Sequence, residues 1–227
     1  MTEPAVTRPA PHWMFPEGRE TRWVALVAVV VAILIQFALP ERLSVGPRWL
    51  LPGVEATIAL GLLVANPFKL ARDSPHIRRA ALLLVAVMSL SNGASAILLI
   101  SGLLHGRLQG GAPALLANGS GVYVTNIIAF ALWYWELDRG GPMARANAVH
   151  LHPDFLFPQM TDATYAPAGW QPKFLDYLFV SFTNATAFSP TDTMPLSRWA
   201  KMLMLLQSAI ALVTVALVVA RAVNIFQ

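Results

Sequence analysis

The feature that most constrains this chain is a series of apolar blocks, each close to the length that crosses a lipid bilayer. A helix needs about 20 consecutive apolar residues to span the hydrocarbon core. Blocks of this kind begin near Trp23, Ala80, Pro113 and Trp199, and a less regular block covers residues 49–65. Apolar residues make up 56% of the chain and charged residues 12%, far from the composition of a soluble domain. The chain is therefore predicted to be an all-α integral membrane protein.

The blocks predict about five transmembrane helices. We expect these spans over residues 23–39, 49–65, 80–104, 113–135 and 199–225. Pro52, Gly53 and Glu55 interrupt the second block, so the sequence leaves open whether it crosses completely. The fourth block ends in Trp133-Tyr134-Trp135, which is typical of an aromatic belt at the membrane–water boundary. A short amphiphilic block over residues 173–187 is too short to cross and is predicted to lie at the interface or to re-enter the membrane.

The order of the blocks divides the chain into regions. Residues 1–21 form a polar segment without the pattern of a cleavable signal, so the first span is expected to be retained as an anchor. Residues 22–111 form a three-span membrane region. Residues 112–227 form a second membrane region that contains a long polar loop, residues 136–171. We predict a multi-pass protein of the cell membrane, either a plasma membrane or a bacterial inner membrane, with the lipid bilayer as a partner.

Composition also excludes several kinds of function. The chain has no cysteine, which excludes disulfides, thiolate metal sites and thiol nucleophiles. Its basic excess is modest and lies between the spans, so no nucleic-acid partner is expected. His150, His152 and Asp154 form a short cluster, but a metal site needs further ligands, and a solvated loop is predicted instead. Because no catalytic motif has suitable spacing, neither an enzyme nor a bound cofactor is predicted.

The C-terminal third has a distinctive order of residues. The short block 173–187 runs into Thr-Ala-Phe-Ser-Pro-Thr-Asp at residues 186–192, Pro195 follows Asp192 by three positions, and a long apolar block comes next. Over about residues 175–224 this order resembles the pore module of the potassium-channel superfamily. The resemblance implies an outer helix over residues 113–135, a pore helix over 173–187, a filter-like segment over 188–195 and an inner helix over 198–226.

The filter-like segment departs from the family pattern. After Thr186, the family's threonine, valine, glycine, tyrosine and glycine are replaced by Ala187, Phe188, Ser189, Pro190 and Thr191. A stack of carbonyl rings needs backbone angles that residues with a Cβ rarely adopt, and proline removes an amide hydrogen. These changes exclude a filter of the potassium-selective kind.

The resemblance then implies a weakly selective pathway for monovalent cations in a homotetramer. Hydroxyl groups of Ser189, Thr191 and Thr193 would line this pathway, and Asp192 would form an acidic ring at its mouth. Asp192 could equally be the N-cap of the last helix.

Other polar residues inside the apolar blocks are candidates for function or packing. Glu55 is an ionisable residue in a predicted span, which suggests a functional intramembrane acid, unless Pro52 puts it at the interface. Gln207, Ser208 and Thr214 in the last block could line a pore or form interhelical hydrogen bonds.

The predicted orientation conflicts with that of potassium channels. Lys69, Arg72, Arg78 and Arg79 make the connector 66–79 the most basic short loop, and such loops prefer the cytoplasm. If every span crosses, the pore-like segment also enters from the cytoplasmic side. The alternatives are an external basic loop, a span that does not cross, or an inverted pore.

Three functions are compatible with these patterns. Cation conduction is the prediction, a non-conducting channel-like scaffold or sensor is the first alternative, and a small secondary transporter is the second. The lack of repeated halves counts against the transporter.

Overall fold

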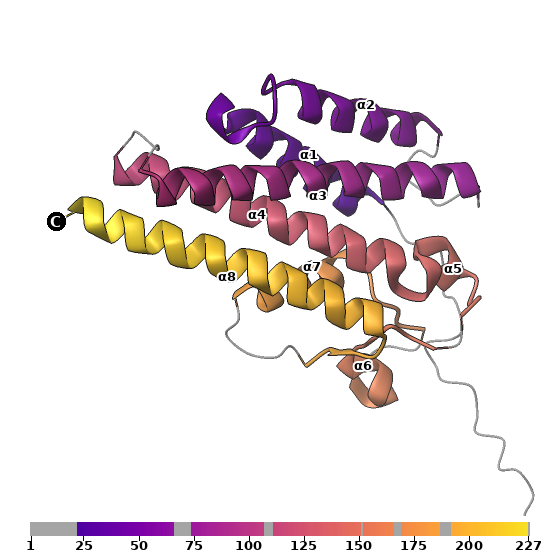
Figure 1. Ribbon diagram of the computed structural model, residues 1–227. Coiled ribbons are helices and arrows are strands. Elements are labelled where there is room, and N and C mark those ends of the chain that lie inside the picture. The colour runs from indigo at the N-terminus through magenta and orange to yellow at the C-terminus, as the bar shows by residue number, and fades with distance from the viewer. Residues whose placement is uncertain are drawn as a thin grey trace, which may run out of the picture.

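A computed structural model describes residues 22–65, 74–106, 111–150, 152–165, 169–186 and 192–226. These residues are mostly helical (Figure 1). In chain order the elements are α1 (Trp23–Ala38), η2 (Glu41–Leu43), α2 (Leu50–Ala65), α3 (Pro75–Leu104), α4 (Ala112–Leu137), η3 (Asp138–Gly140), α5 (Pro142–Ala146), β1 (Phe155–Leu156), α6 (Pro158–Thr161), η4 (Ala163–Tyr165), α7 (Phe174–Thr186), β2 (Met194–Pro195) and α8 (Arg198–Phe226).

Three helices, namely α3, α4 extended through Gly140, and α8, are long and apolar enough to cross a membrane. This finding is compatible with a membrane protein that has transmembrane helices. Helices α1 and α2 have 16 residues each, fewer than the roughly 20 that a full crossing needs. A helix lies over each of the predicted apolar blocks, but the count of five spans stays a prediction.

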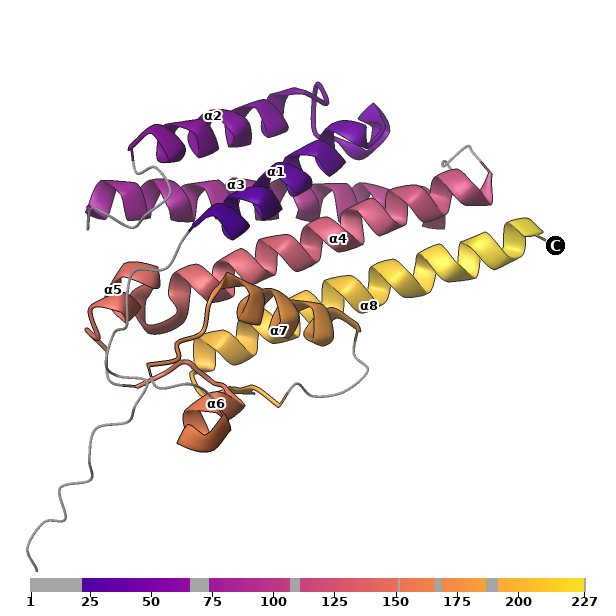
Figure 2. The ribbon, with the colours of Figure 1, turned by 180° about the vertical axis from the view of Figure 1, so that it is seen from behind.

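Helix α4 is the centre of the bundle. It contacts α1 and α3 on one side and α7 and α8 on the other, whereas α2 packs outside it against α1 and α3 (Figures 1 and 2). A Cβ at Gly119 would lie 2.8 Å from the Val218 side chain of α8, and one at Gly121 would lie 3.2 Å from Ile35 of α1. These two glycines therefore let α4 approach both of its neighbours closely, as small residues do in membrane helix pairs.

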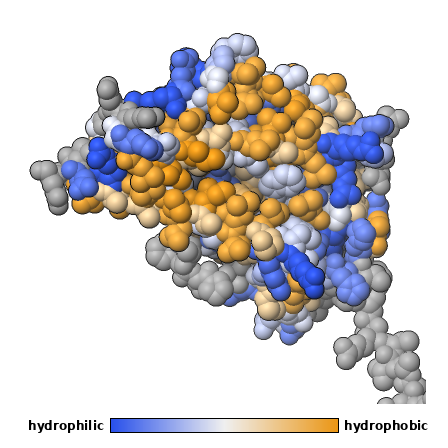
Figure 3. Space-filling model, viewed as in Figure 1, coloured by the Kyte–Doolittle hydropathy of each residue, from blue (hydrophilic) through white to orange (hydrophobic). Residues whose placement is uncertain are grey.

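The surface of the bundle separates by polarity. In the view of Figure 3, apolar side chains cover the middle of the helices and hydrophilic side chains gather towards the two ends of the bundle. This distribution fits helices whose axes cross a bilayer and whose ends meet water.

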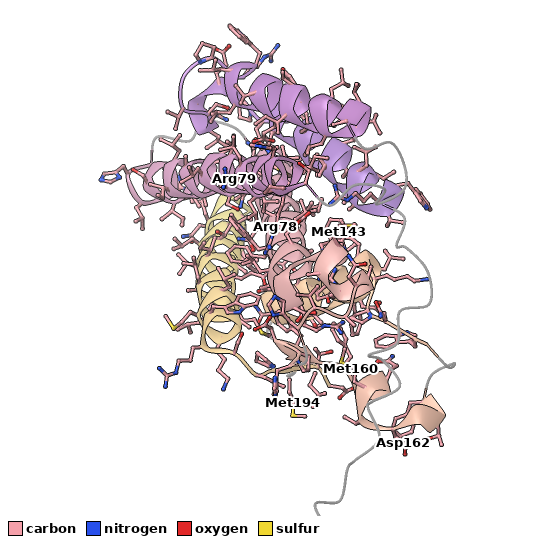
Figure 4. All side chains as sticks on the ribbon, turned by 90° about the vertical axis from the view of Figure 1, so that its right-hand side faces the viewer. Arg78, Arg79, Met143, Met160, Asp162 and Met194 are labelled. Carbon is pink, nitrogen blue, oxygen red and sulfur yellow. The ribbon has the colours of Figure 1, made fainter. Side chains whose placement is uncertain are left out.

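The predicted long loop, residues 136–171, includes α5, β1 and α6 in its described part. Strand β1 pairs with β2 antiparallel, so that Phe155 lies opposite Pro195. This pair joins the end of α4 to the start of α8. Figure 4 looks at the same end of the bundle and shows Arg78 and Arg79 at the start of α3, near Met143 of α5. The basic start of α3 and the starts of α7 and α8 therefore share one end, called here the loop end.

Candidate functional site

The described part of the predicted pore-like segment starts and ends at the same end of the bundle. Helix α7 starts at the loop end and packs against both α4 and α8, and the chain returns to β2 at the same end (Figure 2). The helix predicted over residues 173–187 exists, within one residue at each end, and its role in a pore stays a prediction. Its 13 residues extend roughly 20 Å, too little to cross a bilayer.

Of the predicted pore residues 186–193, the structure describes Thr186, Asp192 and Thr193. Thr186 is half-buried, and its hydroxyl donates to the carbonyl oxygen of Thr183 over 3.0 Å. Asp192 is exposed and Thr193 is buried. Ala187, Phe188, Ser189, Pro190 and Thr191 lie outside the described residues.

Gln207 fastens α7 to α8 and α4. Its Nε2 donates to the carbonyl and hydroxyl oxygens of Ser181, over 3.0 and 2.6 Å. Its Oε1 accepts from the Tyr134 hydroxyl at 2.6 Å and from Asn184 Nδ2 at 2.8 Å. The Ser181 hydroxyl donates onward to the carbonyl oxygen of Ile127 over 2.7 Å. Both donor and both acceptor positions of the fully buried Gln207 amide are thus occupied.

The three inner-helix residues predicted as pore lining or packing face into the subunit. Gln207 and Thr214 are buried, and the half-buried Ser208 donates to the Asn184 carbonyl over 3.1 Å. For Gln207 and Ser208 the observed contacts are interhelical hydrogen bonds, the second alternative from the sequence. The Thr214 hydroxyl has no hydrogen-bond partner within the described ranges.

A second polar cluster closes the loop end of the site around Asp138. The carboxylate is fully buried and accepts the backbone amides of Asp154 and Phe155, at 2.9 and 3.4 Å, and the Tyr177 hydroxyl at 2.5 Å. Asp154 in turn accepts the indole nitrogen of Trp199 over 2.8 Å. The starts of α7 and α8 are therefore both tied to the end of α4.

Two arginines complete this cluster. Arg139 has a φ of 48°, which is uncommon for a residue with a Cβ, and its backbone amide donates to Asp154 over 2.9 Å. Arg145 donates to the carbonyl oxygens of Trp135 and Asp138 over 2.6 and 2.9 Å. Its guanidinium lies 5.1 Å from the centre of the Tyr177 ring. Burial raises the pKa of the Tyr177 phenol well above its ordinary value, which keeps it a neutral donor.

Two residues of the cluster His150, His152 and Asp154 contact protein groups. The Asp154 carboxylate accepts Arg139 and Trp199, and His150 packs against Gly140. Across the parts of the chain that the structure describes, no group of three or more His, Asp or Glu side chains gathers as metal ligands would.

Glu55 lies inside the N-terminal half of the bundle, and its role as an intramembrane acid or an interfacial residue stays a prediction. The side chain is fully buried between α1, α2 and α3. Its Oε2 accepts Gln36 Nε2 at 2.8 Å, and Gln36 Oε1 accepts the Ser91 hydroxyl at 2.6 Å. Glu55 Oε1 has no hydrogen-bond partner among the residues described. A cavity of about 10 Å³ beside Gln36 and Ser91 has room for roughly one water.

The aromatic run at the end of α4 packs against protein, and its predicted place at a membrane boundary stays a prediction. Tyr134 and Trp135 are buried, and the half-buried Trp133 donates to the Ser89 hydroxyl over 2.8 Å, so the run packs inside the protein. Sequence reasoning missed Asp138, Ser181 and Tyr177. The available signal was an acid directly after an apolar block, but its partners are distant in sequence.

Comparison with known proteins supplies no relative: no protein-family model, curated protein or solved structure matches this chain. The central geometric fact is a short helix held between two long apolar helices by a buried glutamine.

Proposed function

We propose that the chain forms a weakly selective cation pathway as a homotetramer. In this proposal α4 is the outer helix, α7 the re-entrant pore helix and α8 the inner helix. The observation that carries it is the re-entrant unit, because α7 enters and the chain leaves at one end of the bundle while α7 packs between two long apolar helices. Re-entrant segments at membrane depth occur where they are buried in protein or line a water-filled space.

The electrostatics of the unit favour a cation. The carbonyl end of α7 carries partial negative charge, and it points into the bundle, away from the loop end. Asp192 adds a full negative charge where the chain returns to the loop end. Hydroxyl groups of Ser189 and Thr191 would supply the oxygen atoms between these two features, whereas Thr193 is buried inside the subunit.

A pathway of this kind must lie between copies of the chain. The interior of one subunit between α4, α7 and α8 is filled by the Gln207 hydrogen bonds and by buried side chains. In the apolar stretch of 18 residues that could cross a membrane, 22% of α8 is buried inside the subunit, whereas 61% of α4 is buried. Large apolar side chains on α7 are also uncovered, namely Leu175, Phe179 and Phe182. Neighbouring subunits would cover these faces, and lipid would cover the remainder.

The shared end of α3 and α7 bears on orientation. Arg78 and Arg79 at the start of α3 lie at the same end as the start of α7. Because basic loops prefer the cytoplasm, the proposal takes the inverted form, in which the re-entrant segment enters from the cytoplasmic side.

A flux assay on the purified protein in liposomes tests this proposal. We expect potassium and sodium to pass with similar rates and chloride to pass far more slowly. Asp192→Asn should lower cation flux several-fold, because it removes the acidic ring that concentrates cations. Glu41→Gln is the matched control, since it removes an exposed acid at the opposite end of the bundle and should leave flux unchanged.

Two results would overturn the proposal. One is the absence of flux for every ion tested with a confirmed tetramer, which would favour the non-conducting scaffold. The other is a cation flux that Asp192→Asn and Glu41→Gln leave equally unaltered.

A further inference from the structure

Two cavities of opposite character meet at the loop end of the bundle. An apolar cavity of about 80 Å³ lies between α1, α2, α3 and α4, and a polar cavity of about 210 Å³ lies between the starts of α1 and α3 and the turn after α4. Arg22 and Glu136 line both of them. The two cavities are therefore adjoining parts of one amphipathic recess.

The apolar part is a groove walled by four helices. Its sides are aliphatic, with Val29 from α1, Leu62 from α2, Leu84 from α3 and Leu132 from α4 among them. Arg22 and Glu136 are the only charged residues among its described lining residues. A narrow groove of this composition suits an alkyl chain, because such a chain can displace water from every wall without leaving a polar group unpaired.

The polar part is predominantly basic. Arg22 and Arg78 bring two permanent positive charges, His150 adds an imidazole, and Glu136 is the single acid among the described lining residues. Glu136 is 3% exposed, and its one negative charge is outweighed by the two arginines. The first turn of α3, which begins beside Ser74, adds the positive end of a long helix dipole.

Arg22 lies where the apolar and polar parts of the recess meet. Its guanidinium carbon lies 5.8 Å from the centre of the Trp135 ring. Its Nε is buried and has no hydrogen-bond partner in the described part of the chain. A buried guanidinium nitrogen without an acceptor is costly, and an anionic oxygen in the recess would remove that cost.

The Gly140-Gly141 turn shapes the wall of the polar part. Both residues have positive φ, +82° and +97°, which glycine adopts without strain. A Cβ on Gly140 would come within 2.9 Å of the His150 ring. The turn thus allows the imidazole to lie against the backbone at the edge of the recess.

We propose that this recess binds a phospholipid with an anionic headgroup. Arg22 and Arg78 hold the headgroup phosphate, and one acyl chain occupies the groove between Val29, Leu62 and Leu132. The recess lies at the loop end, where the apolar surface gives way to charged residues and where lipid headgroups would lie. This inference does not depend on ion conduction.

The experiment measures lipid retention by the full-length protein. Purified protein in detergent is exchanged against phosphatidylglycerol or phosphatidylcholine, and bound lipid is counted by native mass spectrometry. We expect preferential retention of phosphatidylglycerol, and a roughly tenfold loss of its affinity in Arg22→Gln and in Arg78→Gln. The control Arg42→Gln, an exposed arginine at the opposite end, should retain lipid as the unaltered protein does.

A groove-filling variant separates a lipid from a soluble phosphate. Leu62→Trp should lower phosphatidylglycerol retention while Arg22 and Arg78 remain in place, and inorganic phosphate alone should compete only weakly. Because Arg78 is exposed, its variant tests the site even where Arg22→Gln fails to fold. The inference is overturned if both lipids are retained equally, if Arg42→Gln loses as much affinity as Arg78→Gln, or if phosphate competes fully and Leu62→Trp has no effect.

Discussion

Two buried glutamines, one in each half of the bundle, are partnered very differently. Gln207 joins α8 to α7 and α4, and all of its hydrogen-bonding positions are occupied. Gln36 joins α1 to α2 and α3, and its partner Glu55 keeps one carboxylate oxygen without a partner among the described residues. A saturated amide fixes the position of a helix, whereas an incompletely partnered acid can still take up a proton, a water or an ion.

The difference assigns separate roles to the two halves. The Gln207 network joins α7 to α4 and α8, as the proposed pore helix would require. Glu55 is an ionisable group buried among apolar helices, and its partner Gln36 lines a cavity with room for roughly one water. It is therefore the position in the N-terminal half where substitution should alter chemistry more than packing.

The largest expected effect comes from removing each glutamine. Gln207→Leu removes the acceptor of the Tyr134 hydroxyl and one partner each of the Asn184 amide and Ser181, and we expect the free energy of unfolding to fall by about 2–4 kcal/mol. Gln36→Leu removes the partner of fewer groups and should lower the free energy of unfolding by about 1–2 kcal/mol. Unfolding of both variants in the same detergent provides the measurement. A greater loss for Gln36→Leu would break the comparison.

Replacing Glu55 by glutamine and Gln207 by glutamate gives a sharper test, with smaller expected changes in the free energy of unfolding. Glu55→Gln keeps an acceptor for Gln36 and adds a donor, so its cost should stay below about 1 kcal/mol. Gln207→Glu removes the donor to Ser181 and puts an acid in a dry site, and should cost about 1–3 kcal/mol. Both changes are nearly isosteric, so unfolding free energies compare directly. Equal costs would show that saturation does not distinguish the sites.

The smallest expected effect concerns the start of α7. The Asp176 carboxylate accepts the Lys173 backbone amide over 2.7 Å, a local contact at the first turn of the helix. Asp176→Ala should cost about 0.5–1 kcal/mol, because Gln207 and not this turn holds α7 in place. Asp176→Asn, which keeps an acceptor, serves as its control. A loss as large as that of Gln207→Leu would show that local capping, and not the buried network, positions α7.

Helix positions were predictable because apolar blocks of about the right length are local features of the sequence. Glu55, Pro52 and Gly53 did not break the second block, since Glu55 has Gln36 as a partner and Pro52 lies in the first turn of α2, where a proline is tolerated. The short helix over residues 173–187 was also evident from its flanking polar segments.

The rotation of each helix could not be predicted in the same way. Tyr134 and Trp135 point inward, because Phe155 of the loop packs on Tyr134 and Phe174 of α7 packs on Trp135. Likewise Gln207 faces Ser181 and Tyr134, which are 26 and 73 positions away in the sequence. Such contacts depend on helix packing and have no local signal.

The proposal that ions pass between four copies of the chain is tested most directly by the mass of the full-length protein in a membrane mimetic. The interior of one subunit is filled, so the proposed pathway requires several copies. Native mass spectrometry from mild detergent, repeated from nanodiscs, gives this mass. The account predicts a tetramer in both, retained in Asp192→Asn. A monomer or dimer in both would contradict a central pathway built from α7 and α8.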